Sequence, residues 1–237
     1  MKVIIIAGGL GTRISEETDD KPKPMVLING QPILWHLMNI FSLQGFNDFI
    51  ISTGYKSDVI EKWVNTNTIF DSNVEKMSIS TINTGLHTQT GGRISEVMKV
   101  LPNERVIATY GDGLANVSIE KLLDFHTRHG KLATVTAVRP PARFGYMKIE
   151  ENTVTHFGEK NQSDEGWING GFFVIEPAFF DLIEGDSTLL EREPLERAAK
   201  MGELMSFKHH GFWQCMDTKR DQELLEMLWE KGAPWKN

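Results

Sequence analysis

The sequence predicts an α/β fold with a mainly parallel, open sheet that has helices on both faces. Two observations carry this prediction. The apolar run from Lys2 to Ala7 is continuous, as expected for a strand buried on both faces. Segments with strand-like and helix-like patterns then alternate as far as residue 138. Strands that alternate with helices form βαβ units, so their strands run parallel in one Rossmann-like sheet.

Each predicted element has a pattern of its own. The further strands are short apolar runs, at Met25–Ile28, Phe49–Ser52, Ser78–Ile82, Val106–Tyr110 and Leu132–Val138. The helices repeat apolar residues every three or four positions, at Pro32–Leu43, Ser57–Val64, Ile94–Leu101 and Ser118–His129. Gly130 is a typical helix stop, because glycine adopts the left-handed conformation at little cost.

After residue 138 the alternation loosens. Tyr146–Glu150 and Thr153–Phe157 predict a hairpin, and with it a small antiparallel β addition in the C-terminal half. The remaining elements are strands at Gly171–Ile175 and Leu204–Lys208 and helices at Pro194–Met201 and Lys219–Lys231. No internal repeat, low-complexity stretch or linker interrupts the chain, so we expect a single domain over residues 1–237.

Composition and charge exclude several classes of function. The net charge of -7 disfavours nucleic-acid binding, which needs an excess of Lys and Arg. No apolar run approaches the ~18 residues of a membrane span, so we expect no membrane partner. The single cysteine, Cys215, cannot form an internal disulfide, which favours a reducing cytoplasm. Any positive charge that binds an anionic ligand must therefore be local or come from a metal.

A glycine-rich loop, Gly8–Arg13, follows the first strand and is the first candidate site. Such a loop lets backbone N–H groups approach phosphate, although Gly-Gly also fits a simple tight turn. The G-x-x-x-x-G-K-[ST] loop is absent, and a G-x-G-x-x-G fingerprint fails because Ile14 replaces its last glycine. Arg13 and Lys23, the latter between two prolines, add two cations that suit a triphosphate. The alternative is that Arg13 and Lys23 are ordinary solvated charges that bind no ligand.

Two aspartates form the second candidate site. Asp112 directly follows the strand Val106–Tyr110, at the carboxyl end where α/β folds bind ligands. Asp217 lies just before the last helix, where a helix N-cap is the alternative role. Carboxylates are the ligands that Mg²⁺ prefers, together with phosphate oxygens. We therefore expect both aspartates to bind one Mg²⁺ ion.

The motifs resemble those of the sugar-phosphate nucleotidyltransferases. Ala7–Arg13 with Lys21–Met25 matches the signature of the whole superfamily. Five later motifs resemble the branch of glucose-1-phosphate cytidylyltransferases: Thr90–Arg93, Thr109–Gly113, Arg143–Gly145, Ile168–Phe173, and Phe212–Gln214 with Met216–Thr218. The resemblance runs nearly end to end. Two departures bear on sugar identity and assembly, namely a short segment at residues 66–82 and Asn161 and Cys215 in place of prolines.

The resemblance implies a role for each matched residue. The nucleotide-binding residues would be Ala7, Gly8, Gly9, Leu10, Gly11, Thr12, Arg13, Lys23, Thr88, Arg93 and Gly111. Among these, Arg13 would hold the outer phosphates and Lys23 the phosphates around the reacting centre, while Thr88 and Arg93 would lie near the base and ribose. The sugar phosphate would contact Lys160, Asn169 and Gly170. Asp112 and Asp217 would bind Mg²⁺, and Arg13, Lys23 and Asp112 would be catalytic.

The same resemblance implies the reaction. A sugar 1-phosphate, with α-D-glucose 1-phosphate expected, would attack CTP in line and give CDP-glucose and pyrophosphate. The enzyme would be a cytoplasmic homo-oligomer that serves surface-polysaccharide biosynthesis. Use of dTTP, UTP or GTP, or of another sugar, stays open, because base choice depends on pocket contacts. A non-catalytic nucleotide sensor would be expected to lack a charged site residue, yet Arg13, Lys23, Asp112, Lys160 and Asp217 are all present.

Overall fold

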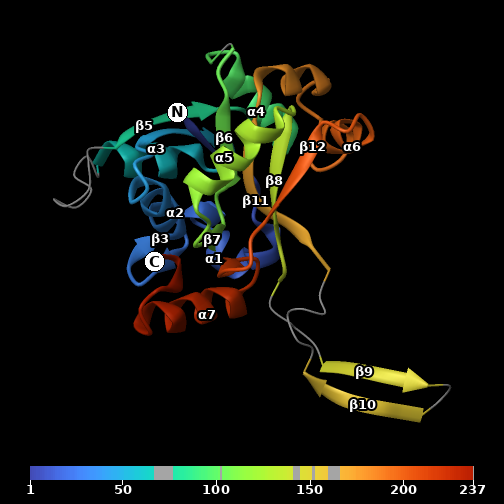
Figure 1. Ribbon diagram of the computed structural model, residues 1–237. Helices are drawn as coiled ribbons and strands as arrows, with labels where there is room; N and C mark the ends of the chain where they lie inside the picture. The colour runs from blue at the N-terminus through green and yellow to red at the C-terminus, as the bar shows by residue number, and fades with distance from the viewer. Residues whose placement is uncertain (67–76, 102, 141–144, 151–152, 160–165, 237) are drawn as a thin grey trace.

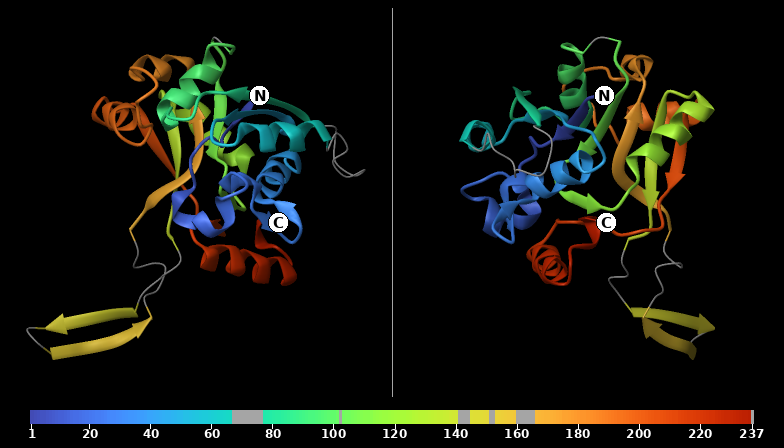
Figure 2. Two further views of the ribbon diagram at one scale, coloured as in Figure 1. Left: turned by 180° about the vertical axis from the view of Figure 1, so that it is seen from behind. Right: turned by 60° about the vertical axis from the view of Figure 1, so that its left-hand side comes forward.

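The computed structural model describes residues 1–66, 77–101, 103–140, 145–150, 153–159 and 166–236. A seven-stranded sheet in the order β12-β8-β11-β6-β1-β4-β5 forms its centre (Figures 1 and 2). Its strands are β1 (Val3–Ile6), β4 (Asp48–Thr53), β5 (Ser78–Asn83), β6 (Val106–Tyr110), β8 (Ala133–Val138), β11 (Ile168–Ile175) and β12 (Leu204–Lys208). Only β11 runs antiparallel to its neighbours in this sheet. The predicted, mainly parallel sheet is therefore confirmed.

Helices cover both faces of this sheet, as predicted. They are α1 (Ser15–Thr18), α2 (Ile33–Ser42), α3 (Ser57–Thr66), α4 (Thr90–Met98), α5 (Ile119–His129), α6 (Glu193–Lys200) and α7 (Lys219–Glu230). Alternate residues of β1 serve different faces: Val3 and Ile5 pack with α2, α3, α5 and α7, whereas Ile4 and Ile6 pack with α4 and α6. This division follows from the period of two in a strand, and it explains why the segment is apolar throughout.

The strand β11 begins earlier than predicted. It starts at Ile168, because a bulge between Asn169 and Phe173 lets the pairing with β8 continue past Gly170 and Gly171. Gly171 has a φ of 79°, which favours glycine, and a Cβ there would lie 2.6 Å from the ring of Tyr110. Glycines often mark the end of a strand, whereas Gly171 brings the backbone of this strand close to Tyr110, and Gly170 brings it close to Val138.

Three two-stranded antiparallel pairs complete the structure. The predicted hairpin is confirmed as β9 (Gly145–Glu150) with β10 (Thr153–Glu159), and it projects away from the main body in all views (Figures 1 and 2). A second pair, β2 (Leu27–Ile28) with β3 (Gln31–Pro32), forms a tight turn. The third pair, β7 (Gly113–Ala115) with β13 (Trp213–Cys215), was not predicted, since its strands are short and distant in sequence.

Within the described residues, every helix is too short or too polar to cross a membrane.

His36 ties the helix α2 to the C-terminal part of the chain. Its imidazole is 1% exposed, donates from Nε2 to the carbonyl of Ile28 at 2.9 Å, and contacts the rings of Trp229 and Trp235 edge-on. The buried Nδ1 atom has no hydrogen-bond partner among the described residues. Burial therefore lowers the pKa of His36 from 6.5 to about 4.

We predict that His36 makes the fold acid-sensitive. Its neutral form stabilises the folded state above pH 6.5, and this contribution is lost as the pH falls toward 4. Between pH 7.5 and 5 the wild type should lose about 2 kcal/mol more free energy of unfolding than the His36→Gln variant. Urea denaturation at both pH values measures this difference, and identical losses in the two proteins would contradict the prediction.

Candidate active site

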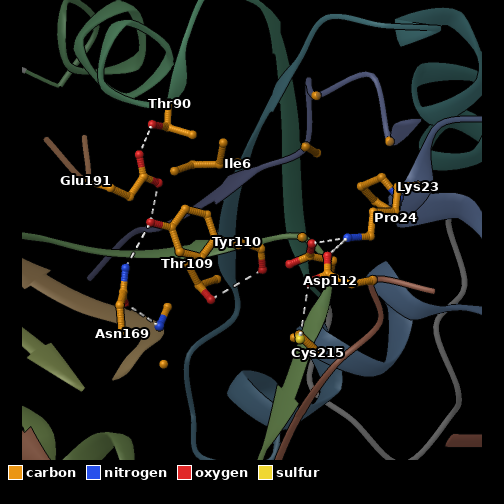
Figure 3. Close-up of a pocket in the computed structure, with 18 of the residues that line it drawn as sticks. Ile6, Lys23, Pro24, Thr90, Thr109, Tyr110, Asp112, Asn169, Glu191 and Cys215 are labelled. Carbon is orange, nitrogen blue, oxygen red and sulfur yellow. Dashed lines mark hydrogen bonds and ion pairs between the residues drawn. The ribbon is translucent and has the colours of Figure 1, made fainter. Parts of the chain in front are cut away.

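A pocket of about 800 Å³ opens at the carboxyl ends of β1 and β6 (Figure 3). Its walls come from the glycine loop, Lys23, the start of α4, the end of β6, the start of β11, and the β13 strand with Asp217. The predicted residues that line it are Ala7, Gly9, Gly11, Thr12, Lys23, Thr88, Arg93, Gly111, Asp112, Asn169, Gly170 and Asp217. Residues from both predicted sites therefore meet in one cavity of a size that suits small-molecule ligands.

Some predicted residues lie outside this lining. Gly8 is buried against the guanidinium of Arg93, and Leu10 is exposed. Lys160 and Asn161, most of the 66–82 segment and the motif residues Arg143 and Phe144 lie outside the described residues, as does the side chain of Arg13.

Lys23 lies at the charged end of the pocket, between the two aspartates. Its Nζ atom is 2.6 Å from Asp112 Oδ2 and 2.6 Å from Asp217 Oδ1. Burial by itself would lower the pKa of Lys23, but the ion pair with Asp112, followed by that with Asp217, outweighs burial and raises the pKa. Lys23 is thus a buried, permanently charged ammonium group at the floor of the pocket.

The pairing of β7 with β13 explains how the aspartates meet. Gly113 lies opposite Cys215 in this pairing, and the N–H of Met216 donates to the carbonyl of Asp112 at 2.9 Å. The helix α7 is capped by Thr218, whose hydroxyl accepts from the N–H of Asp221, and the carboxylate of Asp221 completes a capping box. The alternative of Asp217 as the N-cap is therefore wrong, and its carboxylate points to Lys23.

The aspartate pair has the chemistry of a Mg²⁺ site. The two carboxylate oxygens that contact Lys23 lie within roughly 5 Å of each other, since each is 2.6 Å from Nζ. Oxygen ligands lie about 2.1 Å from Mg²⁺, so a small closure would let both carboxylates bind one ion. No group of three or more His, Cys, Asp or Glu side chains that could bind a metal exists in the described part of the chain. The pair would thus share the ion with substrate phosphates and water.

Arg93 lies under the glycine loop, where it contacts protein oxygens. Its guanidinium is 3% exposed and donates to the carbonyls of Gly8 (2.8 Å), Thr53 (3.0 Å) and Gly85 (2.9 Å) and to the hydroxyl of Thr84 (2.7 Å). Burial lowers the pKa of Arg93, so these bonds offset the cost of burying a charge. A Cβ on Gly8 would lie 2.0 Å from this guanidinium, which explains the glycine at that position.

The opposite wall carries a chain of hydrogen-bonded polar side chains, of which Asn169 was predicted as a site residue and Glu191 was not. The hydroxyls of Tyr110 and Thr90 donate to the two oxygens of Glu191, at 2.5 and 2.6 Å (Figure 3). Asn169 donates to the Tyr110 oxygen at 3.2 Å. Trp213 donates from its indole nitrogen to the carbonyl of Gly170 at 2.8 Å. Tyr110 could have been found as the residue two positions before Asp112, but Glu191 has no local pattern that marks it.

Cys215 is a half-buried free thiol at the edge of the site. Burial, followed by the nearby carboxylates of Asp217 and Asp112, raises the pKa of its thiol to about 12. Its Sγ atom lies 3.7 Å from Asp217 Oδ2. The nucleophilic form of a cysteine is the thiolate, so the raised pKa disfavours Cys215 as a nucleophile.

Comparison with known proteins defines the family. The model of the nucleotidyl transferase family matches residues 2–219. The chain belongs to this family. It is 48% identical to a glucose-1-phosphate cytidylyltransferase of Salmonella typhi, over 100% of this chain and 99% of the relative. A probable glucose-1-phosphate cytidylyltransferase of Bacillus subtilis is 40% identical, with the same coverage.

Solved structures support the fold of this nucleotidyltransferase. The structure of HddC from Yersinia pseudotuberculosis is 25% identical and superposes with a TM-score of 0.75, over 96% of this chain and 99% of that one. A UDP-glucose pyrophosphorylase bound to UDP-glucose has a TM-score of 0.74 at 16% identity, over 97% of this chain and 98% of that one. The second likeness concerns the fold alone.

We predict that Arg93 supports both the fold and the glycine loop. The Arg93→Met variant removes the buried hydrogen bonds of the guanidinium to Gly8, Thr53, Thr84 and Gly85, which should lower the free energy of unfolding by about 2–4 kcal/mol. The variant should also weaken nucleotide binding, because the glycine loop loses the hydrogen bond from Arg93 to the carbonyl of Gly8. Denaturation and calorimetry measure these effects. Lys99→Met, at the exposed end of the same helix, is the control and should change stability by less than about 0.5 kcal/mol.

We also predict that Lys23 competes with metal for the aspartate pair. A cation bound by both carboxylates would take the place of the ammonium between them. In the absence of nucleotide, Lys23→Met should therefore bind Mn²⁺ at least about tenfold more tightly than the wild type, or about 1.4 kcal/mol. Electron paramagnetic resonance of free Mn²⁺ measures this affinity. Lys21→Met serves as the control, and equal affinities for wild type and Lys23→Met would refute the competition.

Proposed function

We propose that this nucleotidyltransferase joins CMP from CTP to α-D-glucose 1-phosphate in a Mg²⁺-dependent reaction that gives CDP-glucose and pyrophosphate. The observation that carries the proposal is the convergence of the glycine loop, Lys23, Asp112 and Asp217 in one pocket. The choice of CTP and glucose 1-phosphate rests on the names of the relatives at 48% and 40% identity.

The chemistry needs no protein nucleophile. An oxygen of the sugar phosphate, already anionic, forms a bond to the α-phosphorus of CTP while the bond to the departing pyrophosphate breaks on the opposite side. Catalysis then consists of positioning and charge stabilisation. Lys23 is the buried cation nearest the reacting centre in this proposal, and the glycine loop offers backbone N–H groups to the phosphates. Mg²⁺ held by Asp112 and Asp217 would neutralise charge on the triphosphate.

The remaining assignments complete the proposal. Arg13 would hold the outer phosphates, Lys160 the sugar phosphate, and Thr88 the nucleoside. Asn169 and Gly170 would contact the sugar. We further propose that residues 1–237 form one domain and that the enzyme works as a cytoplasmic homo-oligomer. CDP-glucose formed in this way would supply sugars for surface polysaccharide.

A pyrophosphate-release screen of CTP, UTP, dTTP, GTP and ATP against several sugar 1-phosphates tests the proposal. We expect the highest kcat/KM for CTP with α-D-glucose 1-phosphate. A site built to bond the edge of one base rejects the others strongly, because the wrong base leaves buried polar groups unpaired. An equal or higher kcat/KM with UTP or dTTP would overturn the choice of CTP and would leave the nucleotidyl transfer in place.

A further inference from the structure

The pocket contains a carboxylate whose described hydrogen-bond partners are neutral. Glu191 accepts from the Tyr110 hydroxyl at 2.5 Å through one oxygen and from the Thr90 hydroxyl at 2.6 Å through the other. Thr90 is itself fixed, since its hydroxyl accepts from the N–H of Leu190 at 2.9 Å. Asp112 and Asp217, by contrast, both contact Lys23. Glu191 is therefore held by neutral donors, and no cation among the described residues contacts its carboxylate.

These donors also leave Glu191 able to accept more hydrogen bonds. A carboxylate has about four lone-pair positions, of which Tyr110 and Thr90 use two. A phenolic hydroxyl is a hydrogen-bond donor, and that of Tyr110 donates to Glu191 at 2.5 Å. Glu191 is exposed to the pocket, where ligand donors can reach its remaining positions.

The charge of Glu191 limits which part of a ligand can lie beside it. A carboxylate without a neighbouring cation repels phosphate, which disfavours Glu191 beside the triphosphate, whereas Asp112 and Asp217 both contact Lys23. Ligand groups that favour a carboxylate are hydrogen-bond donors, here sugar hydroxyls or the amino group of cytosine. The position of Glu191 in the pocket decides between the sugar hydroxyls and the amino group of cytosine.

Glu191 is linked to the residues of the sugar end of the pocket. Tyr110 and Asp112 are two positions apart, at the end of β6 and in the turn that follows it, so their Cα atoms lie no more than roughly 7 Å apart. A sugar whose phosphate lies at Asp112 and Lys23 would therefore place its ring near Tyr110 and Glu191. Asn169, proposed above as a sugar contact, donates to the oxygen of Tyr110. Figure 3 shows these side chains on the side of the pocket away from Lys23.

We propose that Glu191, held by Tyr110 and Thr90, accepts hydrogen bonds from ring hydroxyls of the sugar 1-phosphate and thereby determines sugar specificity. The inference rests on the proposed nucleotidyl transfer to a sugar 1-phosphate. It adds a specificity-determining residue that lies 79 positions after Asp112 and outside the motifs from which the site was predicted.

The test compares Glu191→Gln with the wild type on glucose 1-phosphate and on its 2-, 3-, 4- and 6-deoxy analogues. Glutamine has nearly the same shape but lacks the charge. With glucose 1-phosphate we expect kcat/KM to fall roughly 10- to 100-fold, the range for one charged hydrogen bond. With the analogue that lacks the contacted hydroxyl, the substitution should cost less than about twofold, because the bond is already absent. The KM for CTP should stay unchanged.

Controls separate this role from a purely structural one. Glu193→Gln, two positions later at the start of α6, should leave all the sugars unaffected. If Glu191→Gln does not fold, Tyr110→Phe removes one of the bonds that hold the carboxylate and should weaken the same hydroxyl contact selectively. Thermal unfolding verifies the fold of each variant.

Two outcomes would overturn the inference. An equal loss on glucose 1-phosphate and on every deoxy analogue would mean that Glu191 only shapes the pocket. If Glu191→Gln changed the preference between CTP and UTP but left the relative kcat/KM values of the sugar 1-phosphates unchanged, Glu191 would contact the base. If the wild type uses another nucleotide or sugar, the proposed substrates fail, and the same comparison with the pair that it does use still tests Glu191.

Discussion

The ion pairs of Lys23 with Asp112 and Asp217 are the contacts on which the site depends. They join three distant parts of the chain: the segment after the glycine loop, the end of β6, and the start of α7. Removing one partner of a buried charge cluster leaves the others uncompensated, which is costly in a poorly hydrated pocket. The cluster thus holds the charged end of the pocket together and supplies the groups that phosphate and metal would engage.

The charged cluster of Lys23, Asp112 and Asp217 explains how an acidic chain could bind anionic substrates. A chain of net charge -7 must bind substrates that carry several negative charges. Lys23 provides local positive charge, and the aspartate pair provides a place for a divalent cation. Arg93 contributes indirectly, since its guanidinium bonds the backbone of the glycine loop and the strand ends beneath it. Lys23 together with a divalent cation on the aspartate pair would place net positive charge where the phosphates would lie.

The pocket therefore has two chemically different ends. The charged end carries Lys23 and the aspartates, whereas the other wall carries Tyr110, Glu191 and Asn169, whose mutual contacts are hydrogen bonds between neutral groups and one carboxylate. A ligand with a phosphate at one side and hydroxyls at the other matches this division.

The sequence by itself determined the parallel sheet, most of the helices and strands, and the membership of Lys23 and Asp112 in the pocket. These features depend on local periodicity and on the rule that parallel strands bring their carboxyl ends to one edge. Only the tertiary structure decided that β7 pairs with β13, that Thr218 rather than Asp217 caps α7, and that Glu191 meets Tyr110. Such contacts join residues far apart in the chain, and no local pattern encodes them, because they form only when the packed sheet brings their elements together.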